Sequence, residues 1–212
     1  MNIIRELSES LQKGDRKRVA DLTGKAIRQS IDTKTILDDG LIAGMSIVGE
    51  RFKAHEIFLP DVLLAAKAMY AGMDLLKPLL IKEGIPTIGK VVIGTVQGDL
   101  HDIGKNLVTI MLKGAGFDVI DLGNDVSPQR FVETAEKENA DVLGMSALLT
   151  TTMPVMKTVI DLAKERKLRP KTRIIIGGAS VSADYAREIG ADAYCFDGVS
   201  AVEFVKKSVG RG

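Results

Sequence analysis

The sequence has a single cysteine and no tryptophan, and its positive and negative charges almost cancel. One cysteine, Cys195, cannot form an internal disulfide or supply a multi-cysteine zinc or iron–sulfur site, which fits a reducing cytoplasmic setting. A formal charge of +1, from 29 basic and 28 acidic residues, gives no electrostatic case for nucleic acid or an anionic membrane surface. Aromatic residues make up only 4% of the chain, which argues against a surface for stacking bases.

Long apolar runs and phosphate-binding motifs are also missing. No run of about 18 uncharged apolar residues occurs, so we expect no membrane span. The N-terminus, MNIIRELSESLQKGD, is amphipathic and carries charge early, unlike a signal peptide. Gly98 and Gly104 enclose five residues where a Walker A loop has four, and no Gly-x-Gly-x-x-Gly is present. These absences predict a cytoplasmic protein that binds neither nucleic acid nor membrane.

Residues 1–86 show the periodicity of helices. Apolar residues recur at spacings of three and four, beginning with Ile4, Leu7 and Leu11. Asp15 is a candidate N-cap for a second helix and Asp32 or Thr33 for a third, and Pro60 is a typical first-turn residue for a fourth. The pattern predicts a four-helix bundle domain over residues 1–86. The glycine- and proline-containing segment 84–89 is expected to be a linker and hinge.

The pattern changes from residue 90 onward. Short β-branched runs occur at 90–96, 118–122, 141–147, 173–178 and 192–197, and helical stretches follow near 103–115, 128–139, 153–167, 182–190 and 199–209. Strands alternating with helices predict a flavodoxin-like or Rossmann-like, doubly wound, five-stranded parallel sheet in a domain over residues 90–212. Ligands of such sheets bind at the carboxyl ends of the strands.

His101, one of only two histidines, lies in the loop after the first of these strands, between Asp99 and Asp102. One interpretation is a polar loop in which Asp102 caps the next helix. Another is a metal site, because a ligating imidazole usually donates its other ring N–H to a carboxylate such as Asp99. A single protein ligand cannot build a zinc site. A metal at His101 would therefore need a prosthetic group that supplies the other ligands.

Two further loops follow strands and carry small or hydroxyl residues. Ser146-Ala-Leu148 leads into a run of threonines, and Gly177-Gly178 follows the fourth strand. Taken alone, a hydroxyl residue there is commonly a helix cap, and paired glycines are commonly a turn. Glycines at this edge would also let a planar ligand lie against the backbone.

The combination of these motifs is more specific than any one of them. Asp99-x-His101-x-x-Gly104 is followed after 41 residues by Ser146-x-Leu148, and after 28 more by Gly177-Gly178. This order and spacing resemble the signature of cobalamin-binding corrinoid proteins. Residues 48–69, VGERFKAHEIFLPDVLLAAKAM, are similar to the helical cap of cobalamin-dependent methionine synthase and of small corrinoid proteins from methylotrophic anaerobes. The resemblance spans nearly the whole chain.

The resemblance implies a cobalamin cofactor in its methylcobalamin and cob(I)alamin forms. It implies that His101 replaces the nucleotide base as the lower ligand of cobalt and that Asp99 hydrogen-bonds this histidine. Thr152 stands where methionine synthase has the serine that completes the relay. Because an imidazole can accept a proton near neutral pH, we hypothesise that the histidine takes up a proton when it leaves cobalt, with Asp99 stabilising the protonated form.

The other positions that the resemblance implies to contact the cofactor lie in both domains. In the sheet domain they are Asp102, Ile103, Gly104, Ser146, Leu148, Thr150, Gly177 and Gly178. In the cap, Phe52 and Leu59 match residues that shield the methyl-bearing face. Their alternative interpretation is bundle core, because a spacing of seven would keep both on one helix face.

The resemblance implies a methyl carrier that is not catalytic alone, and no residue is expected to be catalytic. Its expected partners are a substrate:corrinoid methyltransferase, a corrinoid:tetrahydrofolate or corrinoid:thiol methyltransferase (coenzyme M being such a thiol), and a reductive activase. Little sequence follows the last βα unit, so no catalytic domain is expected there. The alternative is a cobalamin-sensing regulatory module. Such sensors add a DNA-binding domain and tend to carry a tryptophan in the cap.

Overall fold

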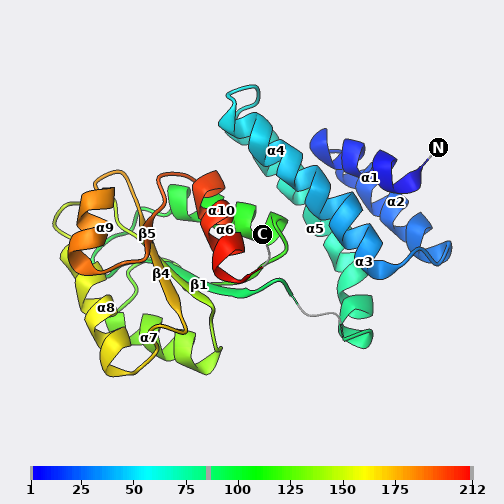
Figure 1. Cartoon of the computed structure of the whole chain (residues 1–212). Coiled ribbons are helices and arrows are strands. Elements are labelled where there is room, and N and C mark those ends of the chain that lie inside the picture. Colours follow the sequence, from blue (N-terminus) through cyan, green and yellow to red (C-terminus); the bar gives the residue numbers. More distant parts are fainter. Residues whose placement is uncertain (1, 85–86, 211–212) are drawn as a thin grey trace. The chain divides into compact units, whose positions relative to one another are not determined.

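The computed structural model of the protein describes residues 2–84 and 87–210 (Figure 1). The Cα positions form two compact units, one drawn from Met1–Pro86 and Gly114–Gly116 and the other from Thr87–Lys113 and Phe117–Gly212. Among the described residues, no helix is both long enough and apolar enough to cross a membrane.

The helical unit is the predicted four-helix bundle. Its first two helices are α1 (Ile3–Gln12) and α2 (Arg16–Arg28), and its last is α5 (Leu59–Lys82). The third is continuous through α3 (Thr33–Thr35), the π-helical segment η1 (Ile36–Ile42) and α4 (Ala43–Lys53). The sequence pattern did not predict the π-helical segment.

Two of the predicted helix caps are present. The Asp15 carboxylate accepts a hydrogen bond from the Arg18 N–H at 2.9 Å, and Asp32 accepts one from the Thr35 N–H at 2.8 Å. Each satisfies a backbone donor that the helix itself leaves unpaired. The apolar faces of the helices then form a core of fully buried side chains, which includes Leu7, Leu11, Val19, Ile36, Leu41, Val62 and Leu76.

The second unit is a five-stranded parallel sheet in the order β2-β1-β3-β4-β5. Its strands are β1 (Lys90–Thr95), β2 (Asp118–Asp121), β3 (Val142–Ser146), β4 (Arg173–Gly177) and β5 (Ala193–Tyr194). The helices are α6 (Ile103–Gly114), α7 (Pro128–Lys137), α8 (Pro154–Glu165), α9 (Ala183–Ile189) and α10 (Gly198–Ser208). α7, α8 and α9 lie on one face of the sheet and α6 and α10 on the other (Figure 1). This strand order is flavodoxin-like, as predicted.

The strand order reverses between β1 and β3, and this reversal fixes where the loops meet. Parallel pairing aligns Thr95 with Ser146 and Ser146 with Gly177, so three strands end in one row. The loops after β1 and β3 leave the sheet side by side at this switch point, the usual place for a ligand in such sheets.

Two predicted boundaries differ from the structure. β5 is shorter than expected because Asp197 caps α10, its carboxylate accepting from the Ser200 N–H at 2.7 Å. In the predicted linker, residues 85–86 lie outside the described residues. Gly89 belongs to the sheet unit, since its carbonyl accepts from the Asp118 N–H at 2.9 Å.

Candidate functional site

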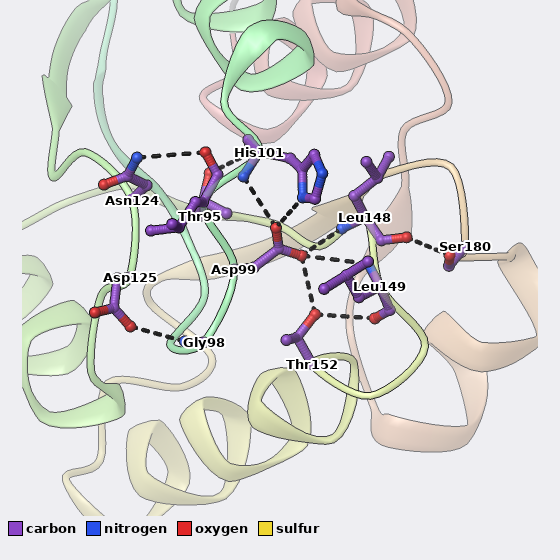
Figure 2. Close-up of polar contacts among 11 residues, drawn as sticks. Thr95, Gly98, Asp99, His101, Asn124, Asp125, Leu148, Leu149, Thr152 and Ser180 are labelled. Carbon is purple, nitrogen blue, oxygen red and sulfur yellow. Dashed lines mark hydrogen bonds and ion pairs between the residues drawn. The ribbon is translucent and has the colours of Figure 1, made fainter.

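The Asp99 carboxylate is fully buried in the loop after β1 and is surrounded by hydrogen-bond donors (Figure 2). Its Oδ1 accepts from the His101 N–H at 3.0 Å and lies 2.8 Å from His101 Nδ1. Its Oδ2 accepts from the N–H groups of Leu148 at 2.7 Å and Leu149 at 3.3 Å, and from the Thr152 hydroxyl at 2.9 Å. A buried charge is tolerated when it is paired in this way.

These donors set the charge of Asp99. Burial acts to raise the pKa of the carboxyl, but the hydrogen bonds from His101, Leu148 and Thr152 outweigh it and hold the pKa well below its usual value. The carboxylate is therefore ionised at neutral pH and only accepts hydrogen bonds. In the neutral imidazole of His101, the proton therefore belongs on Nδ1, where the carboxylate accepts it, and the lone pair belongs on Nε2.

The imidazole of His101 is held by a hydrogen bond at Nδ1, whereas its Nε2 is open. Its side chain is 53% exposed, and Nε2 makes no hydrogen bond to any of the described residues. Within residues 2–84 and 87–210, no group of three or more His, Cys, Asp or Glu side chains is gathered to hold a metal. A metal bound at Nε2 would have one ligand from these residues, and a prosthetic group would have to supply the rest.

Large apolar side chains in the loops that hold this histidine face solvent. Leu100 is 69% exposed, Ile103 77% and Leu148 38%. Exposed apolar groups gathered beside a polar site usually mark a binding surface. A flat apolar macrocycle with a central metal fits both the open Nε2 and this surface.

Two polar residues near the carboxyl edge of the sheet hold the loop after β1, and neither was predicted from the sequence. The Thr95 hydroxyl donates to the His101 carbonyl at 3.0 Å, and Asp125 Oδ1 accepts from the Gly98 N–H at 2.8 Å (Figure 2). Thr95 is the last residue of β1, and Asp125 lies in the loop after β2. Their position at the carboxyl edge of the predicted sheet was the sequence feature that could have identified them as site residues.

Two further contacts of this kind come from neighbouring loops. The Asn124 amide donates to the Leu100 carbonyl at 3.4 Å, and the Ser180 hydroxyl donates to the Leu148 carbonyl (Figure 2). Ser180 lies three residues after the end of β4. The site thus draws on the loops after β1, β2, β3 and β4.

The paired glycines are required by the protein's own backbone. A Cβ on Gly178 would lie 1.8 Å from the Ala147 carbonyl oxygen, and the φ of this residue is +127°. A Cβ on Gly177 would lie 2.8 Å from the Cys195 carbonyl oxygen. These glycines therefore let loops of adjacent strands approach closely. Their predicted contact with a cofactor is a separate matter and stays a prediction.

The remaining predicted residues of the sheet unit differ in their surroundings. Ser146 is half-buried at the end of β3, and Thr150 is exposed. Asp102 directly precedes α6, and its backbone carbonyl accepts from the Asn106 N–H at 2.7 Å, whereas its carboxylate accepts no hydrogen bond from the described residues. A Cβ built on Gly104 would meet nothing within 4 Å beyond its chain neighbours and the backbone of its own helix, which leaves the start of α6 open.

Phe52 and Leu59 lie on different helices of the helical unit. Phe52 is in the last turn of α4, and Leu59 is the first residue of α5, with a turn between them. Both are half-buried, and neither belongs to the buried core. The alternative interpretation, that both are core residues on one helix face, is therefore wrong.

The two residues without a predicted role also have defined places. His55 is exposed in the turn between α4 and α5, with a φ of +59°. Cys195 is buried just after β5, and burial, assisted by Asp197, raises the pKa of its thiol to about 11. The thiol is therefore protonated and unreactive at neutral pH.

Comparisons with known proteins find similar domains for both structural units. A protein-family profile described as "B12 binding domain" matches residues 89–205, and a second profile with the same description matches residues 3–77. The chain is 41% identical to a corrinoid protein of Desulfitobacterium hafniense (strain Y51), covering 100% of this chain and 99% of that protein. It is 42% identical to a dimethylamine corrinoid protein of Methanosarcina barkeri, covering 97% and 96%.

Solved structures lead to the same family. The methanol:cobalamin methyltransferase complex MtaBC from Methanosarcina barkeri contains a chain that matches with a TM-score of 0.88 and 31% identity, covering 98% of this chain and 79% of that one. A cobalamin-binding protein from Desulfitobacterium hafniense DCB-2 matches with a TM-score of 0.80 and 31% identity, covering 98% of both chains. The chain therefore belongs to the corrinoid proteins with B12 binding domains, and its cofactor is cobalamin.

Proposed function

We propose that this chain holds cobalamin with His101 as the lower ligand of cobalt and carries a methyl group between two methyltransferases. One would load the methyl group from a small methylated donor. The other would deliver it to tetrahydrofolate or to a thiol such as coenzyme M, and a reductive activase would restore the active state. The observation that carries the proposal is the His101 imidazole, hydrogen-bonded through Nδ1 to an ionised, buried Asp99 with Nε2 open.

The contacts of Asp99 support a defined part for this residue. An Nδ1–H donated to a carboxylate fixes the tautomer and the ring orientation and raises the basicity of Nε2. Thr152 and the Leu148 N–H in turn hold the other carboxylate oxygen. We propose that Asp99 and Thr152 together set how strongly His101 donates to a metal and hold a proton on Nδ1.

When bound, cobalamin supplies a cobalt ion that accepts and releases a methyl group. The exposed side chains of Leu100, Ile103 and Leu148 would exclude water beside His101. For the following residues we keep the roles implied by the resemblance: contact with the cofactor and its displaced base for Asp102, Gly104, Ser146, Thr150, Gly177 and Gly178, and shielding of the methyl-bearing face for Phe52 and Leu59. We likewise propose residues 1–86 as the cap domain and residues 90–212 as the cobalamin-binding domain.

The names of the relatives support methyltransferase partners and also bear on the donor. They include dimethylamine and trimethylamine corrinoid proteins at 41–42% identity and a monomethylamine corrinoid protein structure at 36%. Another relative belongs to a methanol:cobalamin methyltransferase complex. Because similar chains serve different donors, we propose that the partner methyltransferase selects the donor.

The test is methylation of the purified, reduced holo-protein. The protein would be incubated with cell extract and a panel of donors: methanol, the methylamines, glycine betaine and aryl methyl ethers. A carrier gains methyl only when both extract and donor are present, and His101→Ala lowers this gain while the control His55→Gln does not. Turnover of donor and acceptor by the isolated chain would contradict the carrier proposal.

A further inference from the structure

The helical unit has a groove between α2 and α5 that the proposed function does not use. Two adjacent hollows of about 430 and 460 Å³ share Ala20 and Leu75 as lining residues. We name these two hollows the α2/α5 groove. Its cationic lining comes from α2, and α5 adds Ala71, Asp74 and Leu75.

Positive charge is concentrated on the α2 side of this groove, although the chain as a whole is nearly neutral. α2 carries five basic residues and one acidic residue within 13 positions, whereas the whole chain has a formal charge of +1. Arg18 pairs with Glu6 of α1. The side chains of Arg16, Lys17, Lys25 and Arg28 make no ion pair or hydrogen bond to other described residues. These four cations are available to a partner from outside.

The bottom of the groove is lined by apolar and small side chains. Leu75 is 42% exposed although it is a large aliphatic side chain. Ala20, Gly24 and Ala71 lie around it, and their small side chains leave the surface hollow. An apolar side chain resting on Leu75 would remove both from water, which is favourable by roughly 25 cal/mol per Å² of apolar surface buried.

We propose that the α2/α5 groove docks an acidic amphipathic helix of a protein partner. Glutamate or aspartate side chains of that helix would face Arg16, Lys17, Lys25 and Arg28, and an apolar side chain would rest on Leu75. The inference rests on the proposed function, because a methyl carrier has to associate with its partner enzymes in turn. Charge complementarity speeds association and keeps contacts reversible, as such exchange requires.

Two features of the groove disfavour nucleic acid and membranes as occupants. Asp21 and Asp74 line it together with the cations, and their carboxylates would repel phosphate groups. A helix can place its carboxylates to avoid both, whereas a phosphate backbone or an anionic bilayer cannot.

The test uses the full chain and a defined probe. The probe is a synthetic helical peptide of about 16 residues with glutamates at i, i+4 spacing and two leucines on one face. Titrated into the ¹⁵N-labelled chain, it should shift amide signals of α2 and of the Ala71–Leu75 part of α5. Lys17→Glu/Arg28→Glu should weaken binding by about tenfold, and higher salt should weaken binding to the unmodified chain.

A matched control has the same change of charge elsewhere. Lys137→Glu/Lys207→Glu reverses two exposed lysines of the sheet unit and should leave the affinity within about twofold. Leu75→Ala leaves every charge in place and should weaken binding by about threefold. The dispersion of amide signals checks that each variant is folded.

Each of the following outcomes would overturn the proposal. They are no binding of the peptide, shifts confined to other helices, and equal losses in the two charge reversals. Binding of a single-stranded oligonucleotide or of phosphatidylglycerol vesicles at α2, without peptide binding, would also overturn it. Cobalamin uptake by the same samples separates the two proposals: a chain that binds cobalamin but not the peptide contradicts only the docking groove.

Discussion

Two neighbouring parts of the carboxyl edge of the sheet are held in different ways. The loop after β1 is held by directed hydrogen bonds, which converge on Asp99 and extend to Thr152. Where the loops after β3 and β4 meet, the Ser180 hydroxyl donates to the Leu148 carbonyl, but the backbones also approach so closely that Gly178 lies against Ala147 with no space for a side chain.

The difference separates two tasks within one site. Hydrogen bonds to a carboxylate control where a proton lies and how an imidazole is oriented, so substitutions there should have graded effects on chemistry. Close backbone packing controls only shape, so a substitution there should act through stability.

Gly178→Ala should cause the largest loss of stability. Its Cβ would collide with the Ala147 carbonyl, and its φ is strained for any residue with a side chain. We expect the free energy of unfolding of the apo-protein to fall by about 3 kcal/mol or more, measured by chemical denaturation. The control is Gly104→Ala, which meets no atom within 4 Å and should be neutral or stabilising by about 0.5–1 kcal/mol. Equal losses would contradict the steric account.

Asp99→Asn should cost about 2 kcal/mol, because an amide offers one acceptor oxygen where five donors converge, and its NH₂ group would face donors. Denaturation of the apo-protein measures the loss. The matched control is Asp102→Asn, a half-buried neighbour without such bonds, which should change stability by less than about 0.5 kcal/mol. If Asp102→Asn were the costlier change, the assigned network would be wrong.

Two substitutions of Thr152 separate the contribution of its hydroxyl to stability from that of its methyl group. Thr152→Val removes the donor to Asp99 and should lower stability by about 1–1.5 kcal/mol. Thr152→Ser keeps the hydroxyl and should cost less than about 1 kcal/mol. The same denaturation experiment compares the two variants, and a serine variant as unstable as the valine variant would show that packing dominates.

Acid should remove the contribution of Asp99. Its folded-state pKa is lowered below the ordinary value of 3.8, so its contribution to stability is present above that value and is lost as the pH falls through the folded pKa. The free energy of unfolding should therefore fall more steeply below about pH 4 in the unmodified chain than in Asp99→Asn. Parallel curves from denaturation at stepped pH would argue against the lowered pKa.

Much of this arrangement could be predicted from the sequence because it follows from periodicity. The helical bundle, the alternation of strands and helices and the flavodoxin-like sheet depend on apolar spacing. The meeting of Asp99, His101 and Leu148 depends on strand order, since a reversal between β1 and β3 brings their loops together.

Other features depend on contacts that spacing does not encode. Thr95 and Asp125 hold the loop through single hydrogen bonds to backbone, and such partners are defined only once four loops are placed. The requirement for glycine at position 178 is equally non-local, because the atom that a side chain would meet is the Ala147 carbonyl oxygen in the loop after another strand.

The central claim is that Nε2 of His101 binds cobalt, and its most direct test is electron paramagnetic resonance of the bound cofactor in its cobalt(II) form. An axial nitrogen splits the cobalt lines into triplets if it is ¹⁴N and into doublets if it is ¹⁵N. Because the chain has only two histidines, labelling histidine with ¹⁵N makes the result specific. We predict doublets in the labelled protein and in labelled His55→Gln, and their loss in His101→Ala. Triplets that persist in the labelled protein would show that the cofactor's own base still binds cobalt, and the account would be contradicted.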